Sequence, residues 1–127
     1  MKITAFNPLI VTKDAKAVTE LFEALGFEHT HKKTGINGEV TSYDMKHPDG
    51  FRVDVAQADQ MPQDMTAIRM NVRDFDEAYE FLTAHGFKNA QGDKVTDTGS
   101  SKATLMVSPS GFAISLSEHI RKDSDKE

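Results

Sequence analysis

The sequence predicts an α+β protein built from two β-α-β-β-β modules, and three observations support this prediction. The chain repeats once, because the helix-like segment after Asp14 returns after Asp74 with an offset of 60 residues. Each copy then continues into three strand-like segments. Each copy also has a Pro-x-Gly-Phe turn, at residues 48–51 and 109–112, just before its last apolar strand.

Each helix is predicted from mostly apolar residues at positions i, i+3, i+4 and i+7, which share one helix face. Asp14 and Asp74 stand before the helices, where a carboxylate accepts hydrogen bonds from free backbone N–H groups. Gly26 and Gly86 stand after them, where a left-handed C-terminal cap is expected. The face residues are Val18, Leu21, Phe22 and Leu25 in the first copy and Ala78, Phe81, Leu82 and His85 in the second.

The remaining segments divide into strands, a linker, a loop and a tail. Strands are predicted at residues 3–12, 27–33, 39–46 and 51–57 in the first copy and 66–72, 87–90, 102–108 and 112–118 in the second. We therefore expect modules at 1–57 and 66–118 within one structural domain, joined by a linker at 58–65. The charge run at 119–127 predicts a frayed tail.

The composition excludes several classes of protein. Its 15 Lys and Arg against 20 Asp and Glu give a formal net charge of −5, whereas nucleic-acid binding needs a clustered basic face. The chain has no cysteine, which excludes disulfides and thiolate chemistry. Its first apolar stretch is interrupted at Asn7 and Pro8 and lacks the features of a signal peptide or membrane span. We expect a soluble cytoplasmic protein with no nucleic-acid or membrane partner.

The paired pattern of helix, Gly-Phe, strands and Pro-x-Gly turn over residues 1–118 resembles the vicinal oxygen chelate superfamily. That superfamily includes glyoxalase I, extradiol dioxygenases, fosfomycin-resistance enzymes and bleomycin-resistance proteins. The resemblance implies that the two modules form a cupped mixed sheet with the helices on its outer face. It also implies that two modules, from one chain or from two exchanging chains, enclose a ligand, so we expect a homodimer.

In metal-using members of that superfamily, four ligands lie on the inner face of the cup, and the resemblance places them at Asn7, Asp54, Ala67 and Ser115. A catalytic divalent ion needs at least three good protein donors. Ala67 has no side-chain donor, Ser115 is a poor ligand and Asn7 offers one neutral oxygen. Because only Asp54 is an ordinary ligand, we expect no metal or other cofactor and lean toward a protein that is not an enzyme.

Strand alternation predicts a polar inner face and an apolar face against the helices. We expect a polar or anionic small molecule to bind the polar face; the alternative is a wet sheet surface on which Arg52 or Arg69 pairs with Asp54. Tyr43 and Met106 are candidates for pocket walls or for ordinary packing. The predicted ligand-binding residues are Asn7, Tyr43, Arg52, Asp54, Arg69, Asn71, Met106 and Ser115.

Several other features have two readings. His29 and His31, expected on one face of a strand, suit a shared metal ion or a solvated edge strand. His47 is expected to be exposed, and His85 to cap the second helix. The polar loop at 91–101 is either a lip over the cup or an ordinary surface loop. No nucleophile elbow, phosphate-binding loop or H-E-x-x-H motif is present.

These observations lead to one main hypothesis and two alternatives. The main hypothesis is a metal-free, glyoxalase- or bleomycin-resistance-like protein that binds a small molecule between its modules. The first alternative is a divalent-metal-dependent glyoxalase-like lyase, isomerase or dioxygenase, whose metal is held by Asp54 with Asn7 and water, or with histidines of a partner chain. The second is a degenerate module that serves protein interaction and has no cavity.

Overall fold

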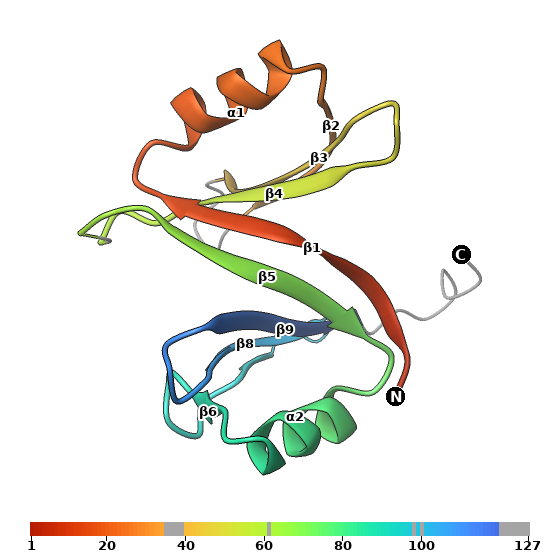
Figure 1. The fold of residues 1–127 in the computed structure, drawn as a ribbon, viewed down its shortest axis with the longest axis vertical. Coiled ribbons are helices and arrows are strands. Elements are labelled where there is room, and N and C mark those ends of the chain that lie inside the picture. Colours follow the sequence, from red (N-terminus) through yellow and green to blue (C-terminus); the bar gives the residue numbers. More distant parts are fainter. Residues whose placement is uncertain (35–39, 61, 98, 100, 120–127) are drawn as a thin grey trace. The chain divides into compact units, whose positions relative to one another are not determined.

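The computed structural model describes residues 1–34, 40–60, 62–97, 99 and 101–119. These residues contain nine strands and two helices, in the α+β class that the sequence predicts (Figure 1). They belong to two compact units: a first unit, Asn7–Ala67, and a second unit, which combines Met1–Phe6 with the chain from Ile68 onward. Nearly all of the predicted tail lies outside the described residues.

The first unit is a mixed sheet with one helix. It contains most of β1 (Ile3–Thr12), α1 (Ala15–Ala24), β2 (Glu28–Thr34), β3 (Val40–Lys46) and β4 (Arg52–Gln57). Neighbouring strands β2, β3 and β4 are antiparallel, and β4 runs parallel to β1. This is the β-α-β-β-β order that the sequence predicts for the first copy.

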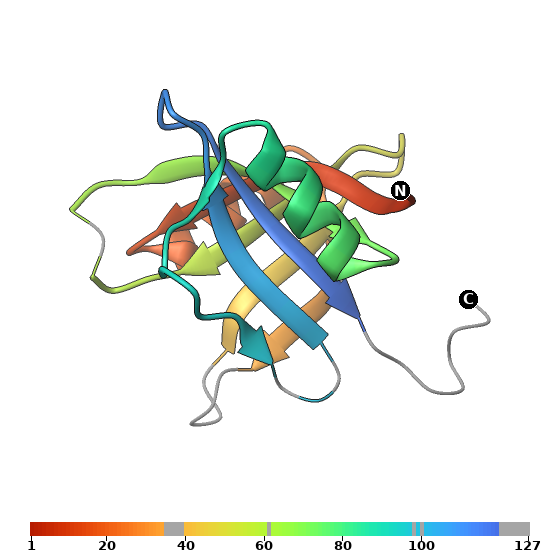
Figure 2. The ribbon, with the colours of Figure 1, turned by 90° about the horizontal axis from the view of Figure 1, so that it is seen from below.

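The second unit repeats this order with one extra short strand. It contains most of β5 (Met65–Val72), α2 (Phe75–Ala84), β6 (Lys88–Asn89), β7 (Thr96–Asp97), β8 (Ser101–Val107) and β9 (Ala113–His119). β5 runs parallel to β9, and β8 is antiparallel to β9, β6 and β7. Figure 2 shows α2 lying over β9, which it contacts. The N-terminal residues join this unit, since the backbone N–H of Arg73 donates to the carbonyl of Lys2 at 3.0 Å.

Both helices begin and end as predicted. Asp14 and Asp74 each accept a hydrogen bond at 3.1 Å from the backbone N–H three residues further on. Gly26 and Gly86 follow the helices with φ of +105° and +94°, in the left-handed region that favours glycine. The ring of His85 lies 2.8 Å from the backbone oxygen four residues earlier, which confirms its capping role.

The last strand of each unit supplies a second helix cap, which the sequence did not indicate. Gln57 Oε1 accepts from the N–H of Ala15 at 2.9 Å, and Glu118 Oε1 accepts from the N–H of Phe75 at 2.6 Å. Both donors belong to the first residue of a helix, where no intrahelical partner exists. Gln57 also donates to the carbonyl of Lys13 at 2.6 Å. The end of the sheet and the start of the helix are thereby joined in both units.

The second unit has a contiguous apolar core between α2 and its sheet. The core residues are Met70, Val72, Phe75, Ala78, Leu82, Met106, Ile114 and Leu116, with Tyr79, Phe87 and Val95 packed against them. Apolar residues on alternate positions of β5 and β9 therefore face the helix, as strand alternation predicts. Burial of these side chains is the main source of stability in this unit.

α1 is packed more sparsely than α2. Its buried residues are Ala15 and Thr19, and Phe22 is half-buried. Leu21 and Leu25, predicted to face the sheet, are 55% and 56% exposed, so this part of the prediction is wrong. The buried stripe follows the spacing i, i+4, i+7 from Ala15, which turns the two leucines toward its margin.

The exposed side of α1 carries a charged pair. Lys16 Nζ lies 3.1 Å from Glu20 Oε2 at the i, i+4 spacing, and this contact raises the pKa of Lys16. Both side chains are largely exposed, so the pair contributes little to stability. Among the described residues, no helix has the length and apolar character needed to cross a membrane.

Candidate ligand-binding face

In the first unit, strand register separates a face against α1 from a face that turns away from it. Tyr43 lies opposite Val55 across the β3–β4 pair. The ring of Tyr43 contacts the ring of His29, and His29 Nε2 lies 2.8 Å from Glu23 Oε2 of α1. Tyr43 and Val55 therefore face α1. We call the other side the helix-free face of the unit, and use the same term for the side of the second unit's sheet away from α2.

The helix-free face of the first unit is polar and carries two carboxylates. Asp44 lies directly opposite Asp54, and Ser42 is two residues from Asp44 on the same strand face. Asp54 also lies beside Leu9 of β1, and Asn7 precedes Leu9 on the same face. Asn7, Ser42 and Asp54 are buried, with 7%, 7% and 6% of their surface exposed. Buried polar side chains of this kind need hydrogen-bond partners.

The hydrogen bonds of this face are only partly formed by the described residues. Asn7 Nδ2 donates to the carbonyl of Pro8 at 2.9 Å, and Asp54 also has an interaction partner. Ser42 Oγ and Asp44 Oδ1, in contrast, are buried and have no partner in the described part of the chain. Neither Ser42 nor Asp44 was predicted as a site residue. The sequence did contain a signal for them, because two polar side chains are poorly suited to the strand face that packs against a helix.

The helix-free face of the second unit carries different chemistry. Arg69 lies opposite Ser115 and Asn71 opposite Ser117 across the parallel β5–β9 pair. The Ser117 hydroxyl donates to Asn71 Oδ1, which holds these two side chains together. Leu105 lies on the other side of Ser115. This face thus offers a guanidinium, an amide and hydroxyls on β5 and β9, beside the apolar side chain of Leu105 on β8.

Most of the predicted ligand-binding residues lie on the helix-free faces, but two do not. The residues at these positions are Asn7, Arg52 and Asp54 in the first unit and Arg69, Asn71 and Ser115 in the second. Met106 lies opposite Ile114 in the core under α2 and is fully buried, and Tyr43 faces α1. The register places Ser42 and Asp44 on the polar face instead. Tyr43 and Met106 are packed against their own unit, which is the alternative that the sequence left open for both residues.

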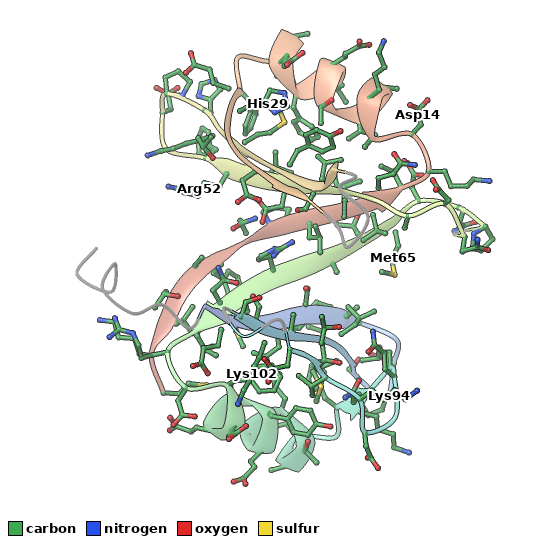
Figure 3. The ribbon with its side chains drawn as sticks, turned by 180° about the vertical axis from the view of Figure 1, so that it is seen from behind. Asp14, His29, Arg52, Met65, Lys94 and Lys102 are labelled. Atoms are coloured by element: carbon green, nitrogen blue, oxygen red, sulfur yellow. The ribbon has the colours of Figure 1, made fainter. Side chains whose placement is uncertain are left out.

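Arg52 begins β4 and lies opposite Lys46 on the neighbouring strand. Its side chain is exposed, near the turn between β3 and β4 (Figure 3). The alternative was that Arg52 or Arg69 pairs with Asp54. No ion pair of Arg52 is found in the described part of the chain, whereas Asp54 and Arg69 each have an interaction partner. Two cations side by side at the strand end repel each other weakly in water.

The four positions that metal-using proteins of this kind employ do not fit a catalytic divalent ion. Ala67 is buried and has no side-chain donor, and Asn7 offers one neutral amide oxygen. Ser115 provides a neutral hydroxyl, which leaves Asp54 as the single carboxylate. Within the described ranges, no group of three or more His, Asp or Glu side chains is placed to hold a metal ion.

The two histidines of β2 do not follow simple strand alternation. His29 lies opposite Met45, whereas His31 lies opposite Asp44, and a bulge separates the two positions. Two residues of β2 thus correspond to one step along β3. The bulge interrupts the regular alternation on which the prediction of a shared strand face depends, and the side chain of His31 lies outside the described part of the structure. The ring of His29 is instead bound to Glu23 and packed on Tyr43.

His47, expected to be exposed, is half-buried in the turn before β4. Its ring contacts the rings of Phe27 and Phe51, with centroids 5.3 and 5.8 Å away. Its Nδ1 accepts a hydrogen bond from the N–H of Asp49 at 3.0 Å. A Cβ added to Gly26 would lie 3.1 Å from His47 Nε2, so the helix end and the turn are in close contact. These contacts give His47 a packing role.

The loop predicted at 91–101 is partly attached to its own unit. Thr96 of β7 lies opposite Ala103 of β8. The Asn89 side chain donates to the carbonyl of Lys94 at 2.9 Å, and Asn89 Oδ1 accepts from Thr104 Oγ1 at 2.7 Å. Residues 98 and 100 lie outside the described part. The described residues of the loop thus behave as an extension of the sheet edge at β8.

No family model matches the sequence, and no curated protein matches it. Solved structures do match. Methylmalonyl-CoA epimerase from Mycobacterium tuberculosis superposes with a TM-score of 0.70 at 14% identity, over 96% of this chain and 92% of that chain. A glyoxalase/bleomycin resistance protein/dioxygenase superfamily member from Vibrio splendidus 12B01 gives 0.59 at 16% identity, over 90% and 97%. The chain has the vicinal oxygen chelate fold.

A third match shows how this fold is reused in longer chains. Glyoxalase I from Zea mays superposes with a TM-score of 0.66 at 16% identity, over 96% of this chain but only 44% of that protein. The fold that the sequence predicts is therefore confirmed. Identities this low establish the vicinal oxygen chelate fold alone, because one fold supports many activities. The function has to be argued from the side chains of the helix-free faces.

Proposed function

We propose that this protein is a glyoxalase/bleomycin-resistance-like binding protein that holds a polar or anionic small molecule on the helix-free face of its sheet without a divalent metal. One observation carries the proposal: the face is polar in both units, while the positions that bind metal in catalytic relatives offer one carboxylate. A polar face built from few charged groups and buried hydroxyls suits recognition of a small molecule. It does not suit Lewis-acid catalysis.

The second unit supplies the support for an anionic ligand group. Arg69 is half-buried beside Ser115, so its guanidinium is partly shielded from water. A guanidinium presents several N–H donors in one plane and binds carboxylates or phosphates in a paired geometry. Asn71 and Ser117 are hydrogen-bonded to each other next to it, which fixes their positions. Arg69 is therefore the first residue to test.

The proposal includes a cytoplasmic homodimer. The absence of cysteine fits a reducing compartment. The Zea mays glyoxalase I chain is more than twice as long as this one, because 96% of this chain matches only 44% of it. Two copies of this chain would provide a comparable number of modules. The proposed dimer rests on this comparison of chain lengths, and a measurement of the number of subunits tests it directly.

Native mass spectrometry of the untagged protein, purified without chelator, tests the proposal. The protein is measured as purified and after addition of Zn²⁺, Ni²⁺, Mn²⁺ or Fe²⁺. We expect a dimer without stoichiometric metal, carrying an organic mass that is lost on denaturation. One tightly bound divalent ion per chain would overturn the metal-free assignment and support the metal-dependent enzyme. A monomer would overturn the proposed assembly.

A mutant pair identifies the part of the face that binds. Once an anionic ligand is in hand, Arg69→Ala should weaken its binding about 10- to 100-fold, the effect of losing a charge-assisted hydrogen bond. Arg52→Ala should also weaken binding if the ligand reaches the start of β4. Arg73→Ala is the matched control, because Arg73 is exposed just after β5. Unchanged affinity in Arg69→Ala would contradict the proposed site.

A further inference from the structure

We infer that the first unit's helix-free face binds a cationic or hydrogen-bond-donating group of the ligand, such as an amine or a guanidinium, through Asp44 and Ser42 of β3. This inference rests on the proposed function and narrows the class of ligand. It concerns two residues that the superfamily resemblance did not indicate.

The charge on this face is the first support for such a ligand group. Asp44 and Asp54 lie directly opposite each other on neighbouring antiparallel strands, where like charges destabilise the pair. Lys46 and Arg52 occupy the next positions on the same face and are both exposed. In the described part of the chain, neither cation forms an ion pair with Asp44. Asp54 has an interaction partner, whereas Asp44 Oδ1 has no hydrogen-bond partner among the described residues.

Two unsatisfied oxygens are the second and independent support. Ser42 Oγ and Asp44 Oδ1 are closed off from solvent and have no hydrogen-bond partner among the described residues. Ser42 is 7% exposed, and it precedes Asp44 at the neighbouring same-face position of β3. The backbone carbonyl of Asp44 is already used, because Thr30 Oγ1 donates to it at 3.3 Å. Buried acceptors without donors are costly, and a donor-rich ligand group would satisfy both.

The donor set favours an organic cation over a metal ion. Ca²⁺ binds six to eight oxygen ligands, and Mg²⁺ needs near-octahedral oxygen coordination. This face offers Asp44, the engaged Asp54, one hydroxyl and the neutral amide oxygen of Asn7, and no three acidic or histidine side chains are placed together among the described residues. An ammonium carries three N–H donors and a guanidinium five, enough to reach a carboxylate and a neighbouring hydroxyl together. Asp44 is half-buried as a residue, while its Oδ1 is enclosed.

Chemical-shift titration of the ¹⁵N-labelled full chain tests the inference with two defined probes. Agmatine supplies an amine and a guanidinium, and succinate supplies two carboxylates. We expect agmatine to shift the backbone amides of β3 and β4 around Asp44 and Asp54 in a saturable way. Asp44→Asn should weaken this binding by about ten-fold or more, and Ser42→Ala by a smaller factor. Asp93→Asn, which removes one exposed charge from the second unit, should leave it within about two-fold.

The outcomes separate this inference from the proposed function. If succinate shifts the amides of Arg69 and Ser115 while agmatine leaves β3 unchanged, the inference is overturned and the proposed function stands. If neither probe acts on either helix-free face, both fail. If Asp44→Asn binds agmatine as tightly as the parent protein does, the inference is overturned. It is also overturned if the β3 amides shift with Mg²⁺ or Ca²⁺ but do not shift with agmatine. Urea denaturation of each variant verifies that it remains folded.

Discussion

The helix of the second unit buries more apolar side chains than the helix of the first unit. Phe75 and Leu82 of α2 lie in a contiguous core, whereas their equivalents are Ala15 and the half-buried Phe22 of α1. The helices have the same length and the same Asp cap. The two units thus share the residues that begin and end their helices, but they differ in how much apolar surface the helices bury.

On the helix-free faces it is the first unit that carries more polar and charged side chains. Asp44 and Asp54 of the first unit correspond to Leu105 and Ser115 of the second, with the same strand pairing. The first unit therefore holds two opposed carboxylates where its repeat has an apolar residue and a hydroxyl. Less apolar packing and more buried polar groups in the first unit are what a trade of stability for the proposed binding would produce.

Core truncation should produce the largest effect and test the inequality of packing. Leu82→Ala removes a side chain buried in the core of the second unit and should destabilise the protein by about 2–5 kcal/mol. Its equivalent, Phe22→Ala, should lower the free energy of unfolding by only about 1 kcal/mol, because the ring is half-exposed. Urea denaturation monitored by circular dichroism measures both. Equal losses would show that the two units are packed alike.

The glycines after the two helices should give the next largest effect. Gly26 and Gly86 both have left-handed φ, so alanine at either position should cost about 1–2 kcal/mol. A new Cβ would lie 3.1 Å from the flexible ring of His47 at Gly26, but 3.1 Å from the rigid ring of Pro109 at Gly86. Gly86→Ala should therefore be the more destabilising variant when both are measured by urea denaturation.

A third glycine separates strain from contact. Gly111 has a φ of +100°, and a Cβ added to it would have nothing within 4 Å, so Gly111→Ala reports the backbone strain alone. We expect its loss to be smaller than that of Gly86→Ala. If all three alanine variants lose the same free energy, the close contacts with His47 and Pro109 are irrelevant to stability.

The repeat, both helices and their caps could be predicted from sequence because these signals are local. Asp14 and Gly26 act on backbone within a few residues, and the spacing of apolar residues follows the helix period. The Pro-x-Gly turns can be predicted for the same reason, because each is encoded by four consecutive residues. The fold class followed once each copy had been read as β-α-β-β-β.

The candidate site could be predicted only in part because it depends on strand register. Shifting β3 by one residue exchanges Tyr43 and Met45 with Ser42 and Asp44, and the sequence of β3 alternates too weakly to fix the choice. The bulge between His29 and His31 is likewise set by pairing with β3. The register of β3 and the bulge in β2 do not depend on a local motif, so the sequence pattern does not predict them.

The long-range helix caps should give a smaller difference. Glu118→Gln places in the second unit the side chain that the first unit uses at Gln57, retaining an oxygen for the N–H of Phe75. It removes the favourable interaction of a carboxylate with the positive end of α2, so we expect a loss of about 0.3–1 kcal/mol. Glu118→Ala, which also removes the hydrogen bond, should lose more in the same urea experiment. A neutral Glu118→Ala would mean that Asp74 alone caps the helix.

The opposed carboxylates should give the smallest effect, and one of opposite sign. Asp44→Asn removes the charge facing Asp54, and relief of like-charge repulsion across a strand pair is worth about 0.2–1 kcal/mol, so this variant should be as stable as the parent or slightly more so. Leu105→Asp is the reciprocal change in the second unit and should destabilise it. If Asp44→Asn is instead clearly destabilised, the Asp44 carboxylate is a structural group of β3. A gain in urea stability combined with loss of agmatine binding would assign that carboxylate to the ligand.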